Sequence, residues 1–275
     1  MISFPNCKIN LGLNIIRKRK DGYHDLETVF YPIDLKDIIE VVENSTGSPD
    51  HAVEFSTSGL QIPGDAGDNL CLKACSLLRY HFPGIPAIKM HLHKSIPMGA
   101  GLGGGSADGA FVLQLLNEKF SLSLTEKKLA ELALQLGSDC SFFIVNRPCF
   151  ASGRGEILEP INLDLSSYSF IIINPGIHIP TARAFSAINP STPSHSIKKI
   201  ITQDPGTWKS QLINDFEESV FIQFPELRDI KKELYKVGAI YSSMTGSGSS
   251  FFGIFPKNQF PVLELDRNYK IYHVI

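Results

Sequence analysis

Several features common in other protein classes are missing from this sequence of 275 residues. No apolar run approaches the roughly 20 residues that a membrane-spanning helix needs. The five cysteines are an odd number without a Cys-x-x-Cys pair, which argues against a disulfide framework and a structural zinc site. The 26 basic and 28 acidic residues give a net charge of −2, so bulk charge attracts neither nucleic acid nor an anionic membrane.

The N-terminal residues also lack the pattern of a signal or transit peptide. We therefore expect a cytoplasmic protein without a membrane or nucleic-acid partner. The short segment 256–275 leaves little room for an additional dimerisation element, so we expect a monomer or weak homodimer. His91 and His93 lie two positions apart on an expected strand. Because no third ligand is in view, we assign no residue to a metal site.

The remaining composition, 43% hydrophobic and 20% charged, is that of a soluble globular protein of one large or two modest domains. Periodicity predicts strands at 4–15, 87–94, 168–173, 239–244 and 250–255, two within 25–43, and one at 51–56 that pairs with those two. It predicts helices at 69–81, from a glycine run to 119, and at 123–137, 181–188 and 225–236. Because strands and helices are mixed rather than strictly alternating, we predict an α+β fold.

Local signals indicate where several helices begin and end. Asp68 is expected to cap the first helix, and Ser123 and Glu126 have the spacing of a capping box at the start of the third. Gly137 is expected to end that helix. The segment 189–207, rich in proline, serine and threonine, is expected to be a surface loop, and 256–275 a short tail.

Glycine is concentrated at one place, since residues 99–105 contain five glycines and a helix is expected to start directly after them. Without a Cβ atom, the backbone adopts positive φ angles and approaches a ligand closely. Its N–H groups and the free N–H groups of the new helix then point at one site and favour an anion. The apolar segments that flank the run argue against a flexible linker, so we predict a phosphate-binding loop.

Three well-known phosphate loops each lack a part in this sequence. Gly99 and Gly104 have the spacing of a P-loop, but Gly105 and Ser106 follow, so the lysine is absent. Gly99, Gly101 and Gly104 match a dinucleotide loop, but a helix starts where the acidic residue is expected, about 20 positions later. The protein-kinase motifs His-Arg-Asp and Asp-Phe-Gly do not occur.

A different pattern fits, namely Pro97 followed by Gly101-Leu102-Gly103 and Ser106-Ala107. It resembles the ATP loop of the GHMP kinases, which include galactokinase, homoserine kinase, mevalonate kinase and phosphomevalonate kinase. Further segments resemble this family in the same order: Pro5-Asn6-Cys7-Lys8-Ile9-Asn10-Leu11, Lys18-Arg19-Lys20-Asp21-Gly22-Tyr23-His24, Leu136-Gly137-Ser138-Asp139, Gly153-Arg154-Gly155-Glu156 and Met244-Thr245-Gly246-Ser247-Gly248. The segment that ends at His24 resembles the branch that phosphorylates a methylerythritol carrying a cytidine diphosphate group.

The resemblance implies a two-domain GHMP kinase fold of the α+β class. Residues 1–160 would form an N-terminal α/β domain similar to ribosomal protein S5, and residues 161–275 a C-terminal ferredoxin-like α+β domain. ATP, with Mg²⁺, would meet the substrate in the cleft between them. The reaction would be phosphorylation of the 2-hydroxyl of the cytidine-diphosphate-linked methylerythritol, a step of non-mevalonate isoprenoid biosynthesis.

The same resemblance assigns the glycine run to ATP. The predicted ATP-binding residues are Pro97, Met98, Gly99, Ala100, Gly101, Leu102, Gly103, Gly104, Gly105, Ser106 and Ala107. Ser106 is expected to bind a β-phosphate oxygen or Mg²⁺, or else to be a plain helix cap. The later turn 246–248 is expected to close the phosphate side of the cleft, or to be a tight hairpin turn that needs no ligand.

Two residues of the family motifs are the candidates for catalysis, Asp139 as base and Lys8 as cation. From the residues alone, Asp139 is equally an N-cap for 140–144, and a lone lysine such as Lys8 on a largely apolar strand is usually just solvated. The resemblance implies that Lys8 faces Asp139 and the reacting hydroxyl, where its charge would lower the pKa of Asp139. Asn10 lies two residues from Lys8 on the same strand face and is predicted to hold the methylerythritol hydroxyls.

The family stacks the cytosine of this substrate between two aromatic rings and reads its edge through the backbone and side chain of a histidine. Tyr23, His24 and Phe185 match those positions, and Thr181 is also predicted to bind substrate. Without the resemblance, Tyr23 and His24 are a turn-packing pair and Phe185 is a core residue. The basic run 17–20 is either a solvated hairpin or an attraction for a polyanionic substrate.

Three other functions are compatible with parts of the sequence. A kinase for mevalonate or homoserine has the same loop, but its substrate has no base to stack on Tyr23. A dinucleotide-binding oxidoreductase is opposed by the missing acidic residue. A catalytically inactive, nucleotide-binding regulator is opposed by the presence of Lys8 and Asp139.

Overall fold

The structure is a computed structural model that describes residues 1–45, 52–186, 188, 190, 191, 193 and 195–275. The chain forms two compact units that interleave along the sequence. Unit 1 comprises Met1–Cys7, Leu35–Met98 and Gly103–Asn146, and unit 2 comprises Lys8–Asp34, Gly99–Leu102 and Arg147–Ile275. Because the units interleave, they do not test the predicted division into 1–160 and 161–275, which stays a prediction.

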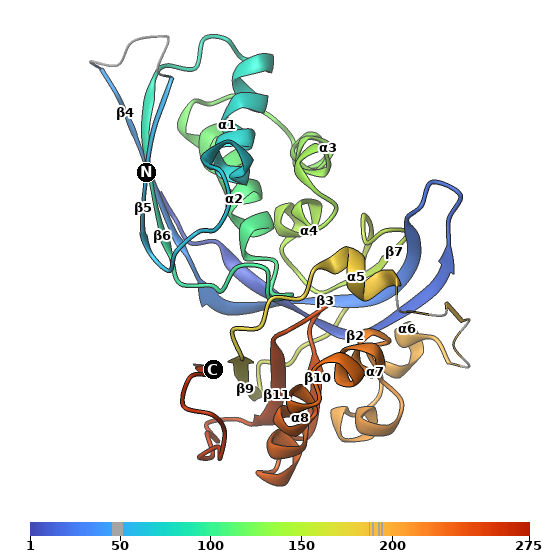
Figure 1. Cartoon of the computed structure of the whole chain (residues 1–275). Helices are drawn as coiled ribbons and strands as arrows, with labels where there is room; N and C mark the ends of the chain where they lie inside the picture. Colours follow the sequence, from blue (N-terminus) through green and yellow to red (C-terminus); the bar gives the residue numbers. More distant parts are fainter. Residues whose placement is uncertain (46–51, 187, 189, 192, 194) are drawn as a thin grey trace. The chain divides into compact units, whose positions relative to one another are not determined.

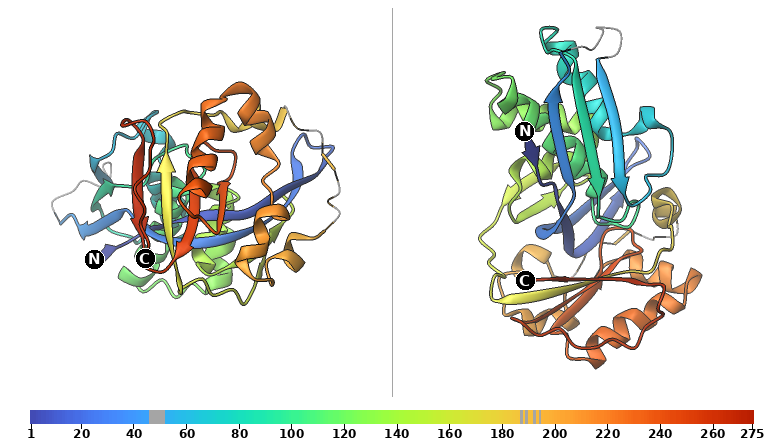
Figure 2. Two further views of the ribbon diagram at one scale, coloured as in Figure 1. Left: turned by 90° about the horizontal axis from the view of Figure 1, so that it is seen from below. Right: turned by 90° about the vertical axis from the view of Figure 1, so that its left-hand side faces the viewer.

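Unit 1 contains a four-stranded sheet with helices packed on one face (Figure 1). The strand order is β1 (Ile2–Ser3), β4 (Ile38–Glu43), β6 (Ile88–Lys94) and β5 (Val53–Gly59). β4 pairs antiparallel with β1 and β6, and β5 pairs parallel with β6. The right-hand view of Figure 2 shows the helices behind this sheet.

The side chains of β6 alternate as predicted, because one face of the sheet is covered. Ile88, Met90 and Leu92 are buried on the helix side. The strand predicted at 51–56 is β5, which begins at Val53, and residue 51 lies outside the described residues. Its predicted pairing was wrong: both edges of β4 are taken by β1 and β6, so β5 pairs with the other edge of β6.

The helical layer of unit 1 consists of η2 (Ala66–Asp68), α1 (Leu70–His81), α2 (Gly104–Lys119), α3 (Glu126–Leu136) and α4 (Cys140–Val145). The predicted extent of α2 and the end of α3 at Gly137 are confirmed. α2 buries one continuous set of apolar side chains: Ala107, Ala110, Val112, Leu113, Leu115 and Leu116.

Both predicted helix caps were wrong by one or two residues. The cap of α1 is Asn69, whose side chain accepts from the backbone N–H of Cys71, whereas Asp68 accepts from Lys73 at 2.8 Å. The cap of α3 is Thr125 rather than Ser123. Asn69 and Thr125 have extended backbones directly before the helix, which is the geometry that lets a side-chain oxygen reach the first free N–H groups.

Unit 2 contains two further sheets of four strands. One has the order β2 (Asn6–Lys18), β3 (His24–Lys36), β7 (Cys149–Ser152) and β8 (Ile157–Pro160). The start of β2, residues 6–7, and the end of β3, residues 35–36, belong to unit 1. The other is antiparallel, with the order β10 (Tyr241–Met244), β11 (Phe251–Pro256), β9 (Tyr168–Asn174) and β12 (Lys270–Val274).

The helices of unit 2 are α5 (Thr181–Ser186), α6 (Ile197–Ile200), η3 (Pro205–Ser210), α7 (Phe216–Gln223) and α8 (Glu226–Lys236). α8 packs on β10 and β11 (Figure 1) and buries Leu227, Ile230 and Leu234 in a core shared with Ile171, Ile173 and Phe251. This mixture of sheets and helices is of the predicted α+β type. Among the described residues, we find no helix both long and apolar enough to span a membrane.

Two segments predicted to be irregular form regular structure in unit 2. The segment 189–207 contains α6 and the start of η3, and Trp208, just past it, is fully buried. The tail contains β12, which pairs with β9. These segments are stabilised by tertiary packing and by a sheet edge, which short polar sequences do not reveal. The predictions for residues 187, 189, 192 and 194 lie outside the described residues.

Unit 1 also buries three charged side chains in one cluster. The ammonium of Lys94 donates to Asp108 at 2.6 Å and to Asp37, and these side chains are at most 4% exposed. Burial raises the pKa of Asp108 to about 7, against the lowering effect of Lys94. The pKa of Lys94 is raised, because the attraction of Asp108 and Asp37 outweighs the effect of burial.

This cluster predicts how stability depends on pH. The folded chain keeps a proton on Asp108 between the ordinary value of 3.8 and about 7, where the unfolded chain has lost it, so stability from this group falls as pH rises through that range. Asp108→Asn removes this dependence. We expect the difference in Tm, that of the variant minus that of the unchanged protein, to become more positive from pH 5 to pH 8.5. A change of about 1 kcal/mol in the free energy of unfolding corresponds to roughly 2–4 °C in Tm.

Thermal unfolding followed by circular dichroism across this pH range makes the measurement. The control is Asp229→Asn, which removes one charge on the exposed side of α8, where Asp229 is paired with Lys232. A difference in Tm that stays constant with pH for Asp108→Asn would contradict the prediction.

Candidate active site

The glycine run has the backbone that was predicted from its composition. Gly99, Gly101 and Gly103 have φ angles of +63°, +78° and +72°, in the left-handed region where side chains are strained. The alternate residues Ala100 and Leu102 are buried and anchor the loop. Gly103 is followed directly by α2, whose first N–H groups have no intrahelical acceptor.

The predicted ATP-binding residues are divided between the two units. Pro97, Met98 and the segment 103–107 belong to unit 1, whereas Gly99–Leu102 belong to unit 2. In unit 1, Ser106 lies in the first turn of α2, but the cap position is Gly103, which makes no side-chain cap. Ser106 is therefore not the plain helix cap that was the alternative.

The later glycine turn packs directly on the first one within unit 2. The hydroxyl of Thr245 donates to the carbonyl oxygen of Gly101 at 3.1 Å, and the N–H of Ser250 donates to that of Ala100 at 3.2 Å. A Cβ atom on Gly101 would lie 2.0 Å from the carbonyl oxygen of Thr245. Glycine at position 101 is thus required both by its φ angle and by this close approach.

Lys8 is a buried residue of unit 2 with 3% exposure, so the alternative of a solvated lysine is wrong. Its ammonium donates to the side-chain oxygen of Asn10 at 2.6 Å and to the carbonyl oxygen of Gly101 at 2.9 Å. It also lies 5.1 Å from the ring centroid of Phe30. The backbone N–H of Lys8 donates to Leu102 at 3.0 Å, so β2 is joined to the glycine loop.

Asn10 holds Lys8 in place through an amide that is engaged at both ends. Its oxygen accepts from Lys8 and from the hydroxyl of Thr245 at 3.2 Å, and its nitrogen donates to Thr28 at 3.0 Å. The side chain is 2% exposed. Its predicted contact with substrate hydroxyls stays a prediction, and the contacts seen in unit 2 orient the lysine.

Asp139 belongs to unit 1 and stands directly before α4. Its side chain makes no capping bond to this helix, so the structure does not support the N-cap alternative. Burial raises the pKa of the next residue, Cys140, to about 12, although a hydrogen bond with Ser106 opposes this. Ser106 of α2 therefore lies close to the start of α4. Since Lys8 belongs to unit 2, its pairing with Asp139 stays a prediction.

The residues predicted to bind cytosine are all in unit 2, and the structure brings two of the three, His24 and Phe185, into contact. The rings of His24 and Phe185 stack with centroids 4.9 Å apart and an angle of 18°. Burial, followed by the charge of Lys18, lowers the pKa of His24. Tyr23 is 57% exposed, and the guanidinium of Arg154 lies 4.9 Å from its ring centroid.

Thr181, the last of the predicted substrate residues, begins α5 and lies 3.3 Å from the hydroxyl of Ser247 in the later glycine turn. Arg154 had no predicted role, although its Gly-Arg-Gly-Glu segment resembles a family motif. Thr245 and Thr28 were also missed, because a threonine on a strand or in a turn has no sequence signal of its own for contacting Asn10.

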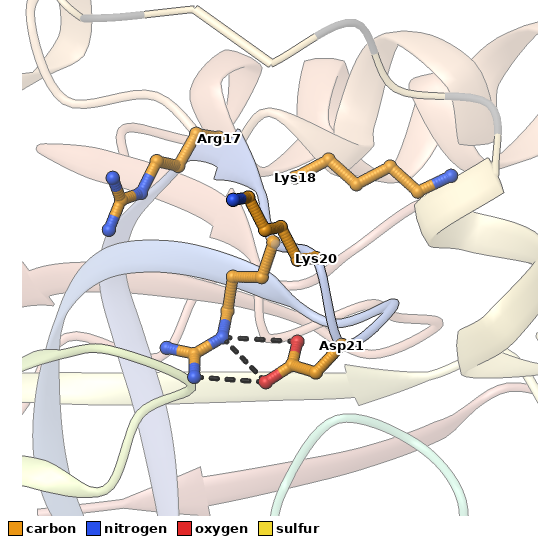
Figure 3. A pocket seen from close by; sticks show the side chains of 5 residues that line it. Arg17, Lys18, Lys20 and Asp21 are labelled. Atoms are coloured by element: carbon orange, nitrogen blue, oxygen red, sulfur yellow. Dashed lines mark hydrogen bonds and ion pairs between the residues drawn. The ribbon is translucent and has the colours of Figure 1, made fainter.

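The basic run 17–20 lies at the tip of the hairpin between β2 and β3 and lines a hollow of about 500 Å³ (Figure 3). Arg19 donates to Asp21 at 3.0 Å and to Asp25 at 2.9 Å, and Arg17 pairs with Asp25. Figure 3 shows Lys18 and Lys20 pointing away from Asp21. Two of the four positive charges are thus paired locally, and the attraction of a polyanionic substrate by this run stays a prediction.

Family models match both halves of the chain. The GHMP kinases N terminal domain matches residues 69–147, and GHMP kinases C terminal matches residues 196–262. A 4-diphosphocytidyl-2-C-methyl-D-erythritol kinase of Bacteroides fragilis is 52% identical over 255 residues, which cover 93% of this chain and 92% of that protein. The chain belongs to this family of GHMP kinases. A relative of the same name from Bacteroides thetaiotaomicron is 51% identical over 98% of this chain and 97% of its own length.

Solved structures agree with this assignment. A crystal structure of a 4-(cytidine 5'-diphospho)-2C-methyl-D-erythritol kinase has a TM-score of 0.80 at 33% identity, covering 92% of this chain and 90% of that chain. The mevalonate kinase of Methanococcus jannaschii has a TM-score of 0.71 at 13% identity over 99% of this chain and 97% of its own, which shows the fold alone. The predicted fold class and kinase activity are confirmed, and the oxidoreductase alternative has no support.

ATP is the phosphate donor of GHMP kinases. In the described ranges, no three His, Cys, Asp or Glu side chains are grouped as metal ligands. Ser106 lies in the first turn of α2 in unit 1, and a hydroxyl is a group that suits a phosphate oxygen or a hard cation.

The contact between the two glycine turns gives a direct test. In Gly101→Ala, the new methyl group meets the Thr245 carbonyl and the loop must move, so we expect kcat/KM for ATP to fall at least about tenfold, equivalent to about 1.4 kcal/mol. The control is Gly176→Ala, because Gly176 has a similar φ of +73° but nothing within 4 Å of its Cβ position. Both variants carry the cost of a left-handed alanine, and only the first carries the clash.

Steady-state kinetics and thermal unfolding of both variants make the comparison. If the two variants lose the same stability and the same activity, the close approach of Gly101 to Thr245 has no functional effect and the prediction is contradicted.

Proposed function

We propose that this chain transfers the γ-phosphoryl group of ATP to the 2-hydroxyl of 4-diphosphocytidyl-2-C-methyl-D-erythritol, giving the 2-phosphate and ADP. The observation that carries the proposal is the buried Lys8, held by Asn10 and by the glycine loop, in a chain 52% identical to a kinase of that name. The proposed place of this reaction is non-mevalonate isoprenoid biosynthesis in the cytoplasm.

The phosphate groups are bound by the glycine run. Positive φ angles at alternate residues direct backbone N–H groups to one side, and the first turn of α2 adds free N–H groups with partial positive charge. Ser106 offers a hydroxyl in that turn. We propose that Mg²⁺ enters with ATP, where it neutralises charge on the phosphate oxygens.

Asp139 takes the proton of the attacking hydroxyl. As the oxygen of the substrate forms its bond to the γ-phosphorus, the bond between that phosphorus and the oxygen of ADP breaks, and the carboxylate of Asp139 holds the released proton.

Lys8 supplies fixed positive charge to the same reaction. Its ammonium is desolvated and oriented by Asn10 and Gly101, so little reorganisation is needed when negative charge develops on the transferred group. Asn10 acts in this proposal as a positioning residue for Lys8, in addition to any contact with the methylerythritol hydroxyls.

The cytosine base is recognised by the aromatic residues of unit 2. Tyr23 offers an exposed ring, and Phe185 is held from the side by Phe216, with ring centroids 4.8 Å apart at 88°. His24 has its pKa lowered by burial, so at neutral pH its ring is uncharged and suited to stacking and hydrogen bonding. Thr181 lies at the start of the same helix as Phe185.

The proposed base predicts a specific kinetic loss. Asp139→Asn keeps the shape of the side chain but removes the proton acceptor, so we expect kcat to fall roughly 10²- to 10⁴-fold with KM for ATP nearly unchanged. A coupled ADP-release assay measures this. The matched control is the exposed Asp229→Asn, and a parallel rise in KM for ATP would instead assign Asp139 to nucleotide or metal binding.

The cytidine assignment is tested with a panel of acceptors in the same assay: 4-diphosphocytidyl-2-C-methyl-D-erythritol, the same compound without cytidine, mevalonate and homoserine. We expect turnover of the cytidine compound alone. Phe185→Leu should raise the KM for the cytidine compound roughly 5- to 150-fold, because base stacking is lost while an apolar side chain remains. This fold-change is equivalent to about 1–3 kcal/mol of stacking free energy. Turnover of mevalonate or homoserine would overturn the cytidine assignment and leave the kinase chemistry in place.

A further inference from the structure

The charged cluster of Lys94, Asp37 and Asp108 in unit 1 has no part in the chemistry proposed above. Lys94 is the last residue of β6, and its ammonium is completely buried between the two carboxylates. Asp37 lies between β3 and β4, and Asp108 lies in the second turn of α2. One ammonium therefore ties a strand end, a strand connection and a helix together.

Asp37 also holds the segment that leads into the glycine run. Its second carboxylate oxygen accepts from the backbone N–H groups of Ser95 at 2.6 Å and Ile96 at 2.8 Å. The N–H of Asp37 itself donates to Pro5 at 2.8 Å, so this residue is fixed on both sides. The residues just before Pro97 are thereby set by one carboxylate.

The ammonium of Lys94 lies directly beneath the first turn of α2. A Cβ atom on Gly104 would lie 3.1 Å from this nitrogen and 2.8 Å from the side chain of Ile96. Glycine at position 104 therefore lets the start of the helix approach the charged cluster. Asp108, one turn further along the helix, accepts a hydrogen bond from the same nitrogen at 2.6 Å.

Such a cluster is not explained by stability alone. Burying ion pairs gains little net stability over well-packed apolar side chains, because each charge loses its hydration. Moreover, the second oxygen of Asp108 is buried and has no hydrogen-bond partner in the part of the chain that the structure describes. What the cluster does provide is geometry, since its directional hydrogen bonds hold the helix start at a fixed position relative to the strand end.

We propose that Lys94, Asp37 and Asp108 are positioning residues that hold the 95–96 segment and the first turn of α2 in the geometry that binds the phosphates of ATP. This inference rests on the proposed assignment of the glycine run to ATP. The three residues touch neither substrate, and they act through the backbone that does.

The test replaces Asp108 by leucine, which removes the tie to α2 and leaves Lys94 paired with Asp37. We expect KM for MgATP to rise at least about tenfold, or about 1.4 kcal/mol. The kcat at saturating ATP and the KM for 4-diphosphocytidyl-2-C-methyl-D-erythritol should change less than about threefold, since the acceptor residues and the base are unaltered. Asp108→Asn keeps an oxygen for Lys94 and should return KM for MgATP to within about threefold of the original value.

Leu132→Ala provides the matched control. Leu132 is a 1% exposed residue of α3 in the same unit, so its truncation lowers Tm without touching the cluster. It should leave KM for MgATP unchanged. If Asp108→Leu lowers Tm as Leu132→Ala does but leaves KM for MgATP unchanged, or raises both KM values equally, the proposal is overturned.

A fourth variant separates this proposal from the assignment of the loop. Gly103→Ala strains the left-handed residue before α2. If it raises KM for MgATP while Asp108→Leu does not, the loop binds ATP and only the positioning role is wrong. If neither variant changes KM for MgATP, the loop assignment and the positioning role are both wrong.

Discussion

The backbone of the first glycine turn approaches the carbonyl oxygen of Thr245 so closely that a Cβ atom at Gly101 would lie 2.0 Å from it. This contact joins two glycine-rich turns that are 144 residues apart in the chain. It also exposes the carbonyl oxygen of Gly101 to the hydroxyl of Thr245 and to the ammonium of Lys8. The orientation of the proposed catalytic cation therefore depends on the absence of a side chain at position 101.

Asn10 and Thr245 extend this constraint through unit 2. The hydroxyl of Thr245 has two acceptors within reach, the carbonyl oxygen of Gly101 and the side-chain oxygen of Asn10, and it can donate to either. The backbone N–H of Asn10 donates to the oxygen of this hydroxyl at 3.1 Å. Asn214 secures the same turn, because its amide donates to the carbonyl oxygens of Met244 at 2.8 Å and Gly246 at 2.9 Å. Lys8 thus sits in a network of neutral, buried hydrogen bonds whose members have little freedom to move.

Much of this arrangement is predictable from sequence, because it is local. The glycine run, the alternation of β6 and the extent of α2 are each encoded in a short segment, and the structure has them where the patterns predict. The resemblance to a family marks Lys8 and Asp139 as candidates for catalysis. No local pattern distinguishes them from a solvated lysine and a helix cap.

Other features depend on residues far apart in sequence and were missed for that reason. β12 exists because β9 has a free edge, and β5 pairs with β6 because β4 is already paired on both sides. The cap of α1 depends on which of two adjacent residues, Asp68 or Asn69, has the extended backbone. The roles of Thr28 and Thr245 follow from the position of Asn10, which only the folded chain shows.

Two buried lysines have different proposed roles at the glycine run, and their hydrogen-bond partners explain the difference. A P-loop places its lysine on the phosphates, and this sequence has no lysine at that position. The ammonium of Lys94 lies close to Gly104, but it donates hydrogen bonds to the carboxylates of Asp37 and Asp108. Its proposed role is therefore to orient the helix rather than the ligand. Lys8 instead donates to the amide of Asn10 and the carbonyl of Gly101, whose neutral dipoles orient the ammonium without cancelling its charge. The proposed division of work between holding the loop and stabilising transferred charge thus follows from pairing one lysine with carboxylates and orienting the other with neutral oxygens.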